Sequence, residues 1–487
     1  MQKYANLLPA KIYLRPSNLY MIKLYRRAIL CVLIVFANHV FGQQVLVTEA
    51  KKKELNTLAV EAENSFAKSH QRALSLAPGF GWYTRRRTHN GGLVSLQGLT
   101  NLGFPRYLIT HDNVDAAATV GTLQVQPGGS TGLNLSGSSA FLTGKLAMWD
   151  GGWVYNSHQE FAGKAILFGD TSTVGDHSTH VAGTLLAKGI YAPARGMAFD
   201  MNTLLSYDFN NDVAEMGRAA SGLLLSNHSY GDVAGWDYND IQSRWEWYGL
   251  PGDTVDYSFG FYDSRAAAWD KIAYNAPYYL IVESAGNSHG YPGPAVGATY
   301  WGYASRTNPT MVNKGPRPAN ISSNTGYDVI TTTATAKNIL TVGAINPLPN
   351  GPSSSADIKV ASFSSFGPTD DGRVKPDIVG DGVSILSTAS SGTQAYSSED
   401  GTSFSAPNVT GSLLLLQEYY AKKNGGAFMK AATVKALACH TAIDAGNVGP
   451  DYIYGWGLLN MVAATQAVTD NNVKSLIKEL NPDLDNL

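Results

Sequence analysis

One serine of this chain stands in a sequence context that favours nucleophilic chemistry. Residues 401–411 read GTSFSAPNVTG and run directly into Ser412 and four leucines. The small residues allow a sharp turn, Pro407 is tolerated in the first turn of a helix, and the leucines predict that this helix is buried. Ser403 is then expected at a helix N-terminus, where free N–H groups and the helix dipole stabilise negative charge. A serine that attacks a carbonyl group beside an oxyanion site needs such an environment.

An aspartate and a histidine occupy positions that suit the partners of such a serine. Asp150 ends the apolar run 146–149 and precedes two glycines. A carboxylate beside apolar neighbours needs a hydrogen-bond partner to stay ionised, although Asp-Gly is also a common turn. His177 begins a predicted helix that Gly189 can end. His180 is expected to be a structural, hydrogen-bonded histidine, because helical metal-binding pairs usually stand four residues apart with an acid between them.

A glycine-asparagine turn is the fourth segment of interest, after those of Ser403, Asp150 and His177. The apolar run 278–283 leads into the sequence SAGN, which ends at Asn287. Taken alone, this asparagine is an ordinary loop residue. Together, however, the segments of Ser403, His177 and Asn287 resemble the motifs G-T-S-x-S-A-P, H-G-T-H-V-A-G-T and A-A-G-N of subtilisin-like serine peptidases. The order Asp150, His177, Ser403 is also the subtilisin order, and it differs from that of chymotrypsin-like enzymes and α/β-hydrolases.

The resemblance implies a role for each of these residues. Ser403 is expected to attack the scissile carbonyl, His177 to take and return the proton, and Asp150 to orient the imidazole. Asn287 and the backbone N–H of Ser403 are expected to bind the oxyanion. Residues 226–231 resemble the family's edge strand, on which an extended polypeptide substrate binds by β-augmentation. The resemblance assigns substrate binding to Ser229, Tyr230, Gly231, Ala285 and Gly286.

The resemblance extends beyond these motifs and spans residues 140–468. The family's F-S-x-x-G-P, K-P-D-I and G-x-G-x-x-N segments are matched by residues 362–368, 375–378 and 455–460. There are two departures. Ser178 replaces a glycine of the histidine motif, and residues 380–382 read GDG where the family has A-P-G. Neither departure falls on a residue that is expected to take part in the chemistry.

Short apolar runs alternate with helical stretches from about residue 135 onward. The predicted strands are 145–149, 203–207, 222–226, 278–283, 338–344 and 377–387. Such alternation predicts a parallel sheet with helices on both faces, and functional residues gather at the carboxyl ends of its strands. We therefore expect an α/β protein with the subtilisin-like three-layer fold, a mostly parallel, doubly wound sheet and a small N-terminal α+β extension.

Residues 1–42 are predicted to be a leader and signal peptide. Basic residues precede the nine-residue apolar run 28–36, and Gly42 is the small residue before the expected cut. The run is too short for a stable membrane anchor. We therefore expect a secreted, cell-surface or periplasmic protein without a membrane span once the signal is removed.

The next segment, residues 43–135, is predicted to be a propeptide or a permanent N-terminal extension. It contains an amphipathic helical pattern over 49–76 and two short apolar runs, 93–96 and 107–109, which suggest a strand pair. Its three consecutive arginines, 85–87, form either a processing site or, as the favoured alternative, a solvated turn. The peptidase domain is expected over residues 136–468, with a C-terminal tail over 469–487.

Composition limits the partners. The formal net charge is −2, and residues 1–42 carry six Lys or Arg and no acid, so the rest of the chain is more acidic. This argues against nucleic acid and leaves polypeptide substrates and an intramolecular propeptide as expected partners. Outside the predicted signal, Cys439 is the single cysteine, so no internal disulfide is expected.

The remaining features are not assigned to the chemistry, which is expected to need no cofactor. Structural calcium is an open alternative for the acidic loops 208–212 and 232–240, but neither matches the EF-hand pattern, and solvated loops are the default. The tryptophan-rich insertion after residue 232 is expected to cover a small core of its own rather than to line a substrate groove.

The favoured function is a secreted serine endopeptidase. Two alternatives use the same scaffold: a catalytically silent surface or adhesion protein, and a peptide ligase or processing enzyme that excludes water. A sedolisin-like enzyme is disfavoured, because His177 stands where that group places a glutamate.

Overall fold

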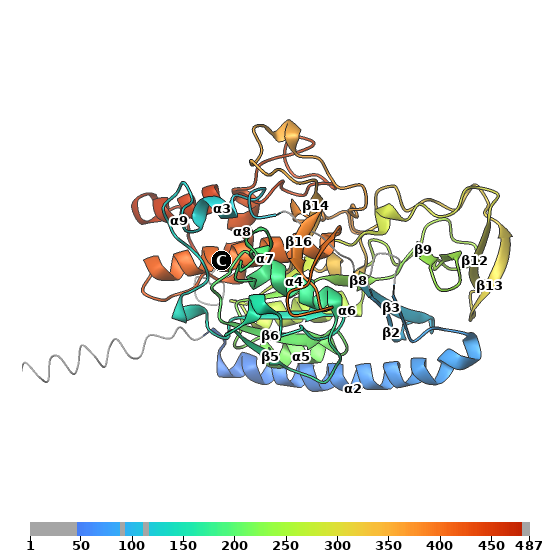
Figure 1. Cartoon of the computed structure of the whole chain (residues 1–487). Coiled ribbons are helices and arrows are strands. Elements are labelled where there is room, and N and C mark those ends of the chain that lie inside the picture. The colour runs from blue at the N-terminus through green and yellow to red at the C-terminus, as the bar shows by residue number, and fades with distance from the viewer. Residues whose placement is uncertain (1–45, 88–92, 111–115, 480–487) are drawn as a thin grey trace, which may run out of the picture. The chain divides into compact units, whose positions relative to one another are not determined.

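The computed structural model describes residues 46–87, 93–110 and 116–479, and Figure 1 shows its elements. The largest sheet has seven strands in the order β15-β14-β11-β7-β4-β6-β5. Every neighbouring pair of this sheet is parallel. Its strands are β4 (Leu146–Asp150), β5 (Ala165–Phe168), β6 (Thr203–Asp208), β7 (Leu225–His228), β11 (Leu280–Ser284), β14 (Leu340–Ile345) and β15 (Ile378–Asp381).

Helices cover both faces of this sheet. The helix α7 (Thr402–Lys423) packs on β7, β11, β14 and β15, and its four leucines at 413–416 are fully buried. It also contacts α4 (Asp176–Leu186), α8 (Ala431–His440) and α9 (Met461–Lys474). On the other face lie α5 (Asp212–Ala219) and α6 (Ser264–Asn275), with α2 outside them (Figure 1). The predicted three-layer α/β fold with a parallel sheet is therefore confirmed.

One predicted strand is wrong. The run 377–387 forms two separate strands, because the chain leaves the central sheet after Asp381. A side chain at Gly382 would lie 2.7 Å from the carbonyl oxygen of Gly401, so the backbone passes close to the start of α7 there. The second strand, β16 (Ile385–Thr388), instead pairs antiparallel with β17 (Tyr396–Glu399).

The predicted N-terminal helix and strand pair are present. The helix α2 (Glu49–Phe80) begins after Thr48, whose hydroxyl accepts a hydrogen bond from the Lys51 N–H, and it buries Leu55 and Leu58. It packs on α5 and ends at Gly81, whose φ of +68° favours glycine. Three strands follow, β1 (Arg85–Arg87), β2 (Leu93–Leu99) and β3 (Pro105–Thr110), and they form a four-stranded sheet with β8 (Tyr230–Asp232).

The tryptophan-rich insertion forms a small sheet. Its strands, in the order β13-β12-β10-β9, are β9 (Trp236–Asn239), β10 (Arg244–Trp247), β12 (Thr299–Ser305) and β13 (Asn308–Pro316). Trp236 and Trp247 pack with Tyr300 and Ile321 in a separate hydrophobic cluster, as expected for an insertion with its own core. Trp236 belongs to this cluster and also borders the cleft described below.

Two searches of residues 46–87, 93–110 and 116–479 gave negative results. None of the helices in this described part combines the length and apolar character that a membrane span requires. The same residues contain no cluster of three or more His, Cys, Asp and Glu side chains that is arranged to hold a metal ion.

Candidate active site

Asp150 and His177 meet where β4 ends and α4 begins. The Nδ1 atom of His177 lies 2.6 Å from Oδ1 of Asp150, and the two residues are 4% and 0% exposed. The N–H of Gly151 donates to the same carboxylate oxygen at 2.6 Å. A carboxylate only accepts hydrogen bonds, so Nδ1 of His177 carries a hydrogen, and in this tautomer of the imidazole the lone pair is on Nε2. This tautomer can take up a proton at Nε2.

A backbone clamp fixes the two segments against each other. The N–H of Trp153 donates to the carbonyl of Thr173, and the N–H of Gly175 donates to the carbonyl of Trp153, each at 2.8 Å. Gly152 permits this approach, because its φ is +124° and a Cβ atom there would lie 2.6 Å from the Thr173 oxygen. The glycines that follow Asp150 are therefore needed to bring the carboxylate to α4, beyond forming a turn.

Ser403 is the second residue of α7 and is 1% exposed. Its hydroxyl donates to the carbonyl of Ser229 at 3.3 Å, and the Ser229 hydroxyl in turn donates to the carbonyl of Ser403. The ring centroid of Phe404, the next residue of α7, lies 4.9 Å from that of His177. The predicted nucleophile and the predicted base therefore come from the N-terminal ends of two helices that contact each other.

His180 has a structural environment, as the sequence predicts. Its Nε2 lies 3.3 Å from the carbonyl oxygen of Ser397, and its ring contacts Phe404 edge-on. Burial, and then the neighbouring His177, lower the pKa of His180 to about 3. The ring is therefore neutral at physiological pH and helps to fill the space behind Phe404.

Asn287 is held by the residue before Ser403. Its side-chain oxygen accepts hydrogen bonds from the Thr402 N–H at 3.0 Å and from the Thr402 hydroxyl at 2.8 Å. The Thr402 hydroxyl also accepts from the Gly286 N–H at 3.1 Å. These bonds assign the amide orientation and leave the NH₂ group of Asn287 to face away from Thr402. Sequence reasoning missed Thr402, although it is the middle letter of the G-T-S motif.

A small cleft connects these groups. It encloses about 30 Å³ and is bordered by Ser403 and Asn287 on one side and by β8 and the start of the insertion on the other. Its lining consists of Tyr230, Gly231, Asp232, Val233, Ala234, Trp236, Asp237, Ser284, Gly286, Asn287, Ser288, Tyr291, Thr331 and Ser403.

The predicted substrate-binding residues divide into two groups. Tyr230, Gly231 and Gly286 border the cleft, whereas Ser229 and Ala285 are buried and do not belong to its lining. The Tyr230 side chain is 1% exposed, with its hydroxyl bonded to the side chains of His228 and Asp212. The ring of Tyr230 therefore packs in the core. Tyr230 borders the cleft through its peptide backbone.

The strand predicted to pair with substrate already has a partner. Ile109 of β3 stands opposite Gly231 of β8 in an antiparallel ladder, and Thr110 stands opposite Tyr230. Farther along the chain, the carbonyl of Ala116 accepts a hydrogen bond from Asn408, which lies one turn after Ser403 in α7. The N-terminal strand thus occupies the edge of β8 that substrate was expected to pair with, and the described chain resumes beside the helix of the candidate nucleophile.

Charged side chains join the N-terminal segment to the cleft. Arg86 of β1, which is 3% exposed, forms an ion pair with Asp237 of the cleft lining. Burial opposes the Arg86 cation, but Asp237 outweighs it and raises the arginine pKa; burial in turn raises the pKa of Asp237 to about 6. The expectation of a solvated turn is therefore wrong for Arg86. Its charge is neutralised by Asp237, which is distant in the sequence and comes close to Arg86 only in the folded chain.

The acidic loops are also less solvated than expected. Asp212 and Asp232 are 5% and 7% exposed, and both form ion pairs with Arg265 at 3.1 Å. Asp208 is 2% exposed and accepts a hydrogen bond from the hydroxyl of Ser172. These carboxylates are buried structural groups, and acid-rich sequence alone does not distinguish such groups from surface loops.

Comparison with known proteins gives one consistent family. The sequence profile described as the subtilase family matches residues 153–457, so it begins just after Asp150. The chain is 26% identical over 345 residues to an extracellular serine protease of Serratia marcescens, in a match that covers 63% of this chain and 30% of that protein. It is 39% identical over 71 residues to serotype-specific antigen 1 of Mannheimia haemolytica, covering 15% and 7% of the two chains.

Among solved structures, the CspB protease of Clostridium perfringens aligns with a TM-score of 0.48 and 14% identity. That alignment covers 73% of this chain and 97% of the other. The chain matches less than a third of the length of these curated relatives.

Proposed function

Because the chain belongs to the subtilase family of serine peptidases, we propose that it is an endopeptidase that cleaves extended polypeptides through an acyl-enzyme on Ser403. The observation that carries this proposal is the 2.6 Å contact between His177 Nδ1 and Asp150 Oδ1, beside the N-terminus of α7. It fixes the imidazole in the tautomer that a general base requires.

In the proposed reaction, the Ser403 oxygen attacks the scissile carbonyl while its proton moves to Nε2 of His177. The tetrahedral oxyanion accepts hydrogen bonds from the Asn287 side-chain amide and from the backbone N–H of Ser403. His177 then protonates the leaving amine, and the C–N bond breaks to leave the acyl group on Ser403. Water attacks this ester by the reverse proton path and releases the carboxylic acid. Every group used belongs to this chain, and Asp150 orients the imidazole throughout.

A fluorophosphonate probe tests this proposal. We expect the purified protein to be labelled and to release free-carboxyl fragments from casein, and the Ser403→Ala variant to do neither. Ser398→Ala, on the exposed strand β17, is the matched control and should behave as wild type. No labelling would favour a catalytically silent protein, whereas labelling with joined rather than hydrolysed products would favour a ligase.

We also infer that the N-terminal segment acts as an inhibitory propeptide. Three observations support this inference: β3 lies on the strand expected to bind substrate, Arg86 neutralises Asp237 in the cleft, and the chain resumes at Ala116 beside α7. Residues after 116 are integrated into the peptidase, since Thr119 donates to buried Asp381. Processing is therefore proposed between residues 110 and 116, ahead of the sequence-based boundary at 135.

Intact mass and N-terminal sequencing test the propeptide. Wild-type protein should lose the segment up to the 110–116 interval, whereas Ser403→Ala protein should keep it. If both proteins retained residues 46–110 under conditions in which the wild type hydrolyses casein, the segment would be a permanent extension.

We further propose that the protein is exported. The predicted signal peptide, residues 1–42 with a cut after Gly42, lies outside the described residues. Export is supported by the similarity to a protease described as extracellular in Serratia marcescens. Fractionation of the producing cells tests it: the mature chain should be found outside the inner membrane, and fusion of residues 1–42 to a reporter should export the reporter.

A further inference from the structure

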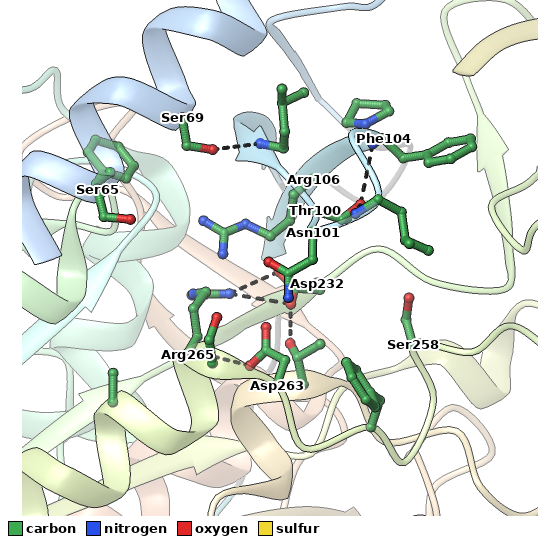
Figure 2. A pocket seen from close by; sticks show the side chains of 18 of the residues that line it. Ser65, Ser69, Thr100, Asn101, Phe104, Arg106, Asp232, Ser258, Asp263 and Arg265 are labelled. Carbon is green, nitrogen blue, oxygen red and sulfur yellow. Dashed lines mark hydrogen bonds and ion pairs between the residues drawn. The ribbon is translucent and has the colours of Figure 1, made fainter. Parts of the chain in front are cut away.

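A large cavity lies between the N-terminal segment and the peptidase, and it shares Asp232 and Val233 with the cleft. Its volume is about 740 Å³, within the range of about 300–1,000 Å³ that is typical of small-molecule sites. The walls come from α2, from the connection between β2 and β3, and from segments around Asp212 and Arg265 (Figure 2). Both parts of the molecule therefore contribute to one cavity, which is partly open to solvent.

Arg106 of β3 extends into this cavity, and Figure 2 shows its guanidinium between α2 and Arg265. Its Nε is shielded from solvent, and among residues 46–87, 93–110 and 116–479 no hydrogen bond or ion pair to this side chain is found. Burial, followed by repulsion from Arg265, lowers the pKa of Arg106 to about 10, despite attraction by Asp232. Arg106 as a whole is half-buried, so its cation is only partly hydrated and lacks the anion that often accompanies such a group.

The aspartates around the cavity, Asp212, Asp232, Asp256 and Asp263, are already engaged. Asp232 and Asp212 accept from Arg265, and Asp232 also accepts from the Thr332 hydroxyl. Asp263 accepts from two backbone N–H groups at the start of α6. Glu61 also borders the cavity but is exposed on α2, so Arg106 is the cation of this lining for which no paired carboxylate is found among the described residues. A carboxylate is the group whose planar geometry suits a guanidinium.

The rest of the cavity is suited to an apolar body. Phe66, Leu102, Leu250 and Phe261 all border it, and Leu102 and Phe261 are 55% and 38% exposed although their side chains are large and apolar. Covering such surface is favourable by about 25 cal/mol per Å². One end of the cavity thus offers a cation and the remainder offers apolar walls.

We propose that this cavity binds an anionic amphiphile, a monocarboxylate with an alkyl chain of fatty-acid type, whose carboxylate pairs with Arg106. Because the walls come from both the N-terminal segment and the peptidase, the ligand stabilises their association. If the segment is inhibitory, as proposed above, the bound ligand also delays its release. Only this last consequence rests on the proposed function.

Binding is tested on the full-length Ser403→Ala protein, which keeps the segment. Titration calorimetry with decanoate below its micelle concentration should give one site, and decanol should bind at least about tenfold more weakly, because it lacks the charge-assisted hydrogen bonds. A peptide with a free C-terminal carboxylate and inorganic phosphate are the comparison ligands. Equal binding of decanol and decanoate would overturn the proposal, as would tight binding of the peptide or of phosphate without decanoate.

Variants of Arg106 separate a ligand contact from a structural role. Arg106→Gln should weaken decanoate binding by about tenfold or more and Arg106→Lys by less, whereas Arg85→Gln, on the exposed part of the same segment, should have no effect. Without ligand, Arg106→Gln should unfold at the same or a higher temperature than its parent, since it removes an unpaired cation. With decanoate the order should reverse.

A lower unfolding temperature for ligand-free Arg106→Gln, with unchanged decanoate affinity, would show that Arg106 is structural and would overturn the proposal. The calorimetry does not depend on Ser403, so its failure leaves the peptidase proposal intact. Conversely, if the wild-type protein were not labelled by fluorophosphonate, the conclusion from the decanoate titration would still hold. In wild-type protein, decanoate should slow the appearance of processed chain, and Arg106→Gln should remove this delay.

Discussion

The molecule has two junctions between elements that differ in how closely they are packed. The packing around α4 and α7, behind the candidate active site, leaves no room for a methyl group: a Cβ on Gly183 of α4 would lie 2.2 Å from the Ser387 hydroxyl of β16, and one on Gly411 of α7 would lie 2.6 Å from Cβ of Met197 and 3.3 Å from the Leu185 oxygen of α4. Where α2 and β3 meet the peptidase, about 740 Å³ remain open and Arg106 has no partner among the described residues.

The difference indicates which junction is built to persist. Close packing locks side chains to within fractions of an ångström, and a triad needs such positions because small misplacements reduce the rate strongly. The second junction, which we call loose because it surrounds a cavity, is held by the buried Arg86–Asp237 ion pair and by hydrophobic contacts of the N-terminal segment, but the cavity leaves part of its surface uncovered. The proposed catalytic groups therefore lie at the tight junction, and the proposed release of the N-terminal segment requires the loose junction to open.

Asp150→Asn is expected to give the largest effect on the tight junction. An amide in place of the carboxylate can donate to His177 Nδ1, which favours the tautomer without a free lone pair at Nε2. We expect kcat to fall by about 10⁴, the magnitude known for this change in another Ser-His-Asp protease. Steady-state kinetics on a peptide substrate measure it, with Asp200→Asn on the exposed surface as control. A fall of less than tenfold would contradict the assigned role of Asp150.

The Asn287–Thr402 pair gives a graded test of the same junction. Asn287→Ala should lower kcat by about 10²–10³ with little change in KM, the magnitude known for the corresponding donor of subtilisin. Thr402→Val removes one of the two bonds that orient the amide and keeps the backbone bond, so a fall of about tenfold is expected. If Thr402→Val were as damaging as Asn287→Ala, the hydroxyl would have a role other than orienting the amide.

Arg86→Met tests the loose junction. It leaves Asp237 buried without its cation, and we expect Ser403→Ala protein to lose about 3–5 kcal/mol of unfolding free energy at pH 8. Adding Asp237→Asn should recover most of the loss, because no charge then remains unpaired. Urea unfolding of the single and double variants measures both effects.

The Arg86 effect should depend on pH in one direction. The folded-state pKa of Asp237 is raised to about 6, above the ordinary value of about 3.9, so protonation of Asp237 favours the folded protein. That contribution is present below about pH 4 and is lost as the pH rises through 6. Removing Arg86 raises the pKa further, so the destabilisation should be smaller at pH 5 than at pH 8. A loss that did not change with pH would mean that Asp237 is not the group left unpaired.

The sequence allowed prediction of the features that depend on a local pattern of residues, such as the strands and the motif segments. The apolar runs before Asp150 and Asn287 indicated parallel strands, and fixed motifs indicated the fold around Ser403. The pairing of β3 with β8 could not be predicted, because Ile109 and Gly231 lie far apart in the chain and many edges accept a strand. The burial of Arg86 was missed for the same reason, since its partner Asp237 is reached only through the fold.

The smallest expected effect comes from the start of α2. Thr48 caps this helix through a long hydrogen bond of 3.4 Å from the Lys51 N–H, so Thr48→Ala should cost about 0.5–1 kcal/mol. The loss falls on the loose junction alone, because α2 contacts α5 and α6 but carries none of the proposed catalytic groups. In Ser403→Ala protein, which keeps the segment, limited proteolysis should therefore cut α2 faster when Thr48→Ala is added, while cleavage within residues 116–479 should be unchanged. Faster cleavage within residues 116–479 as well would show that the two junctions are coupled, and the division between a permanent and a separable region would fail.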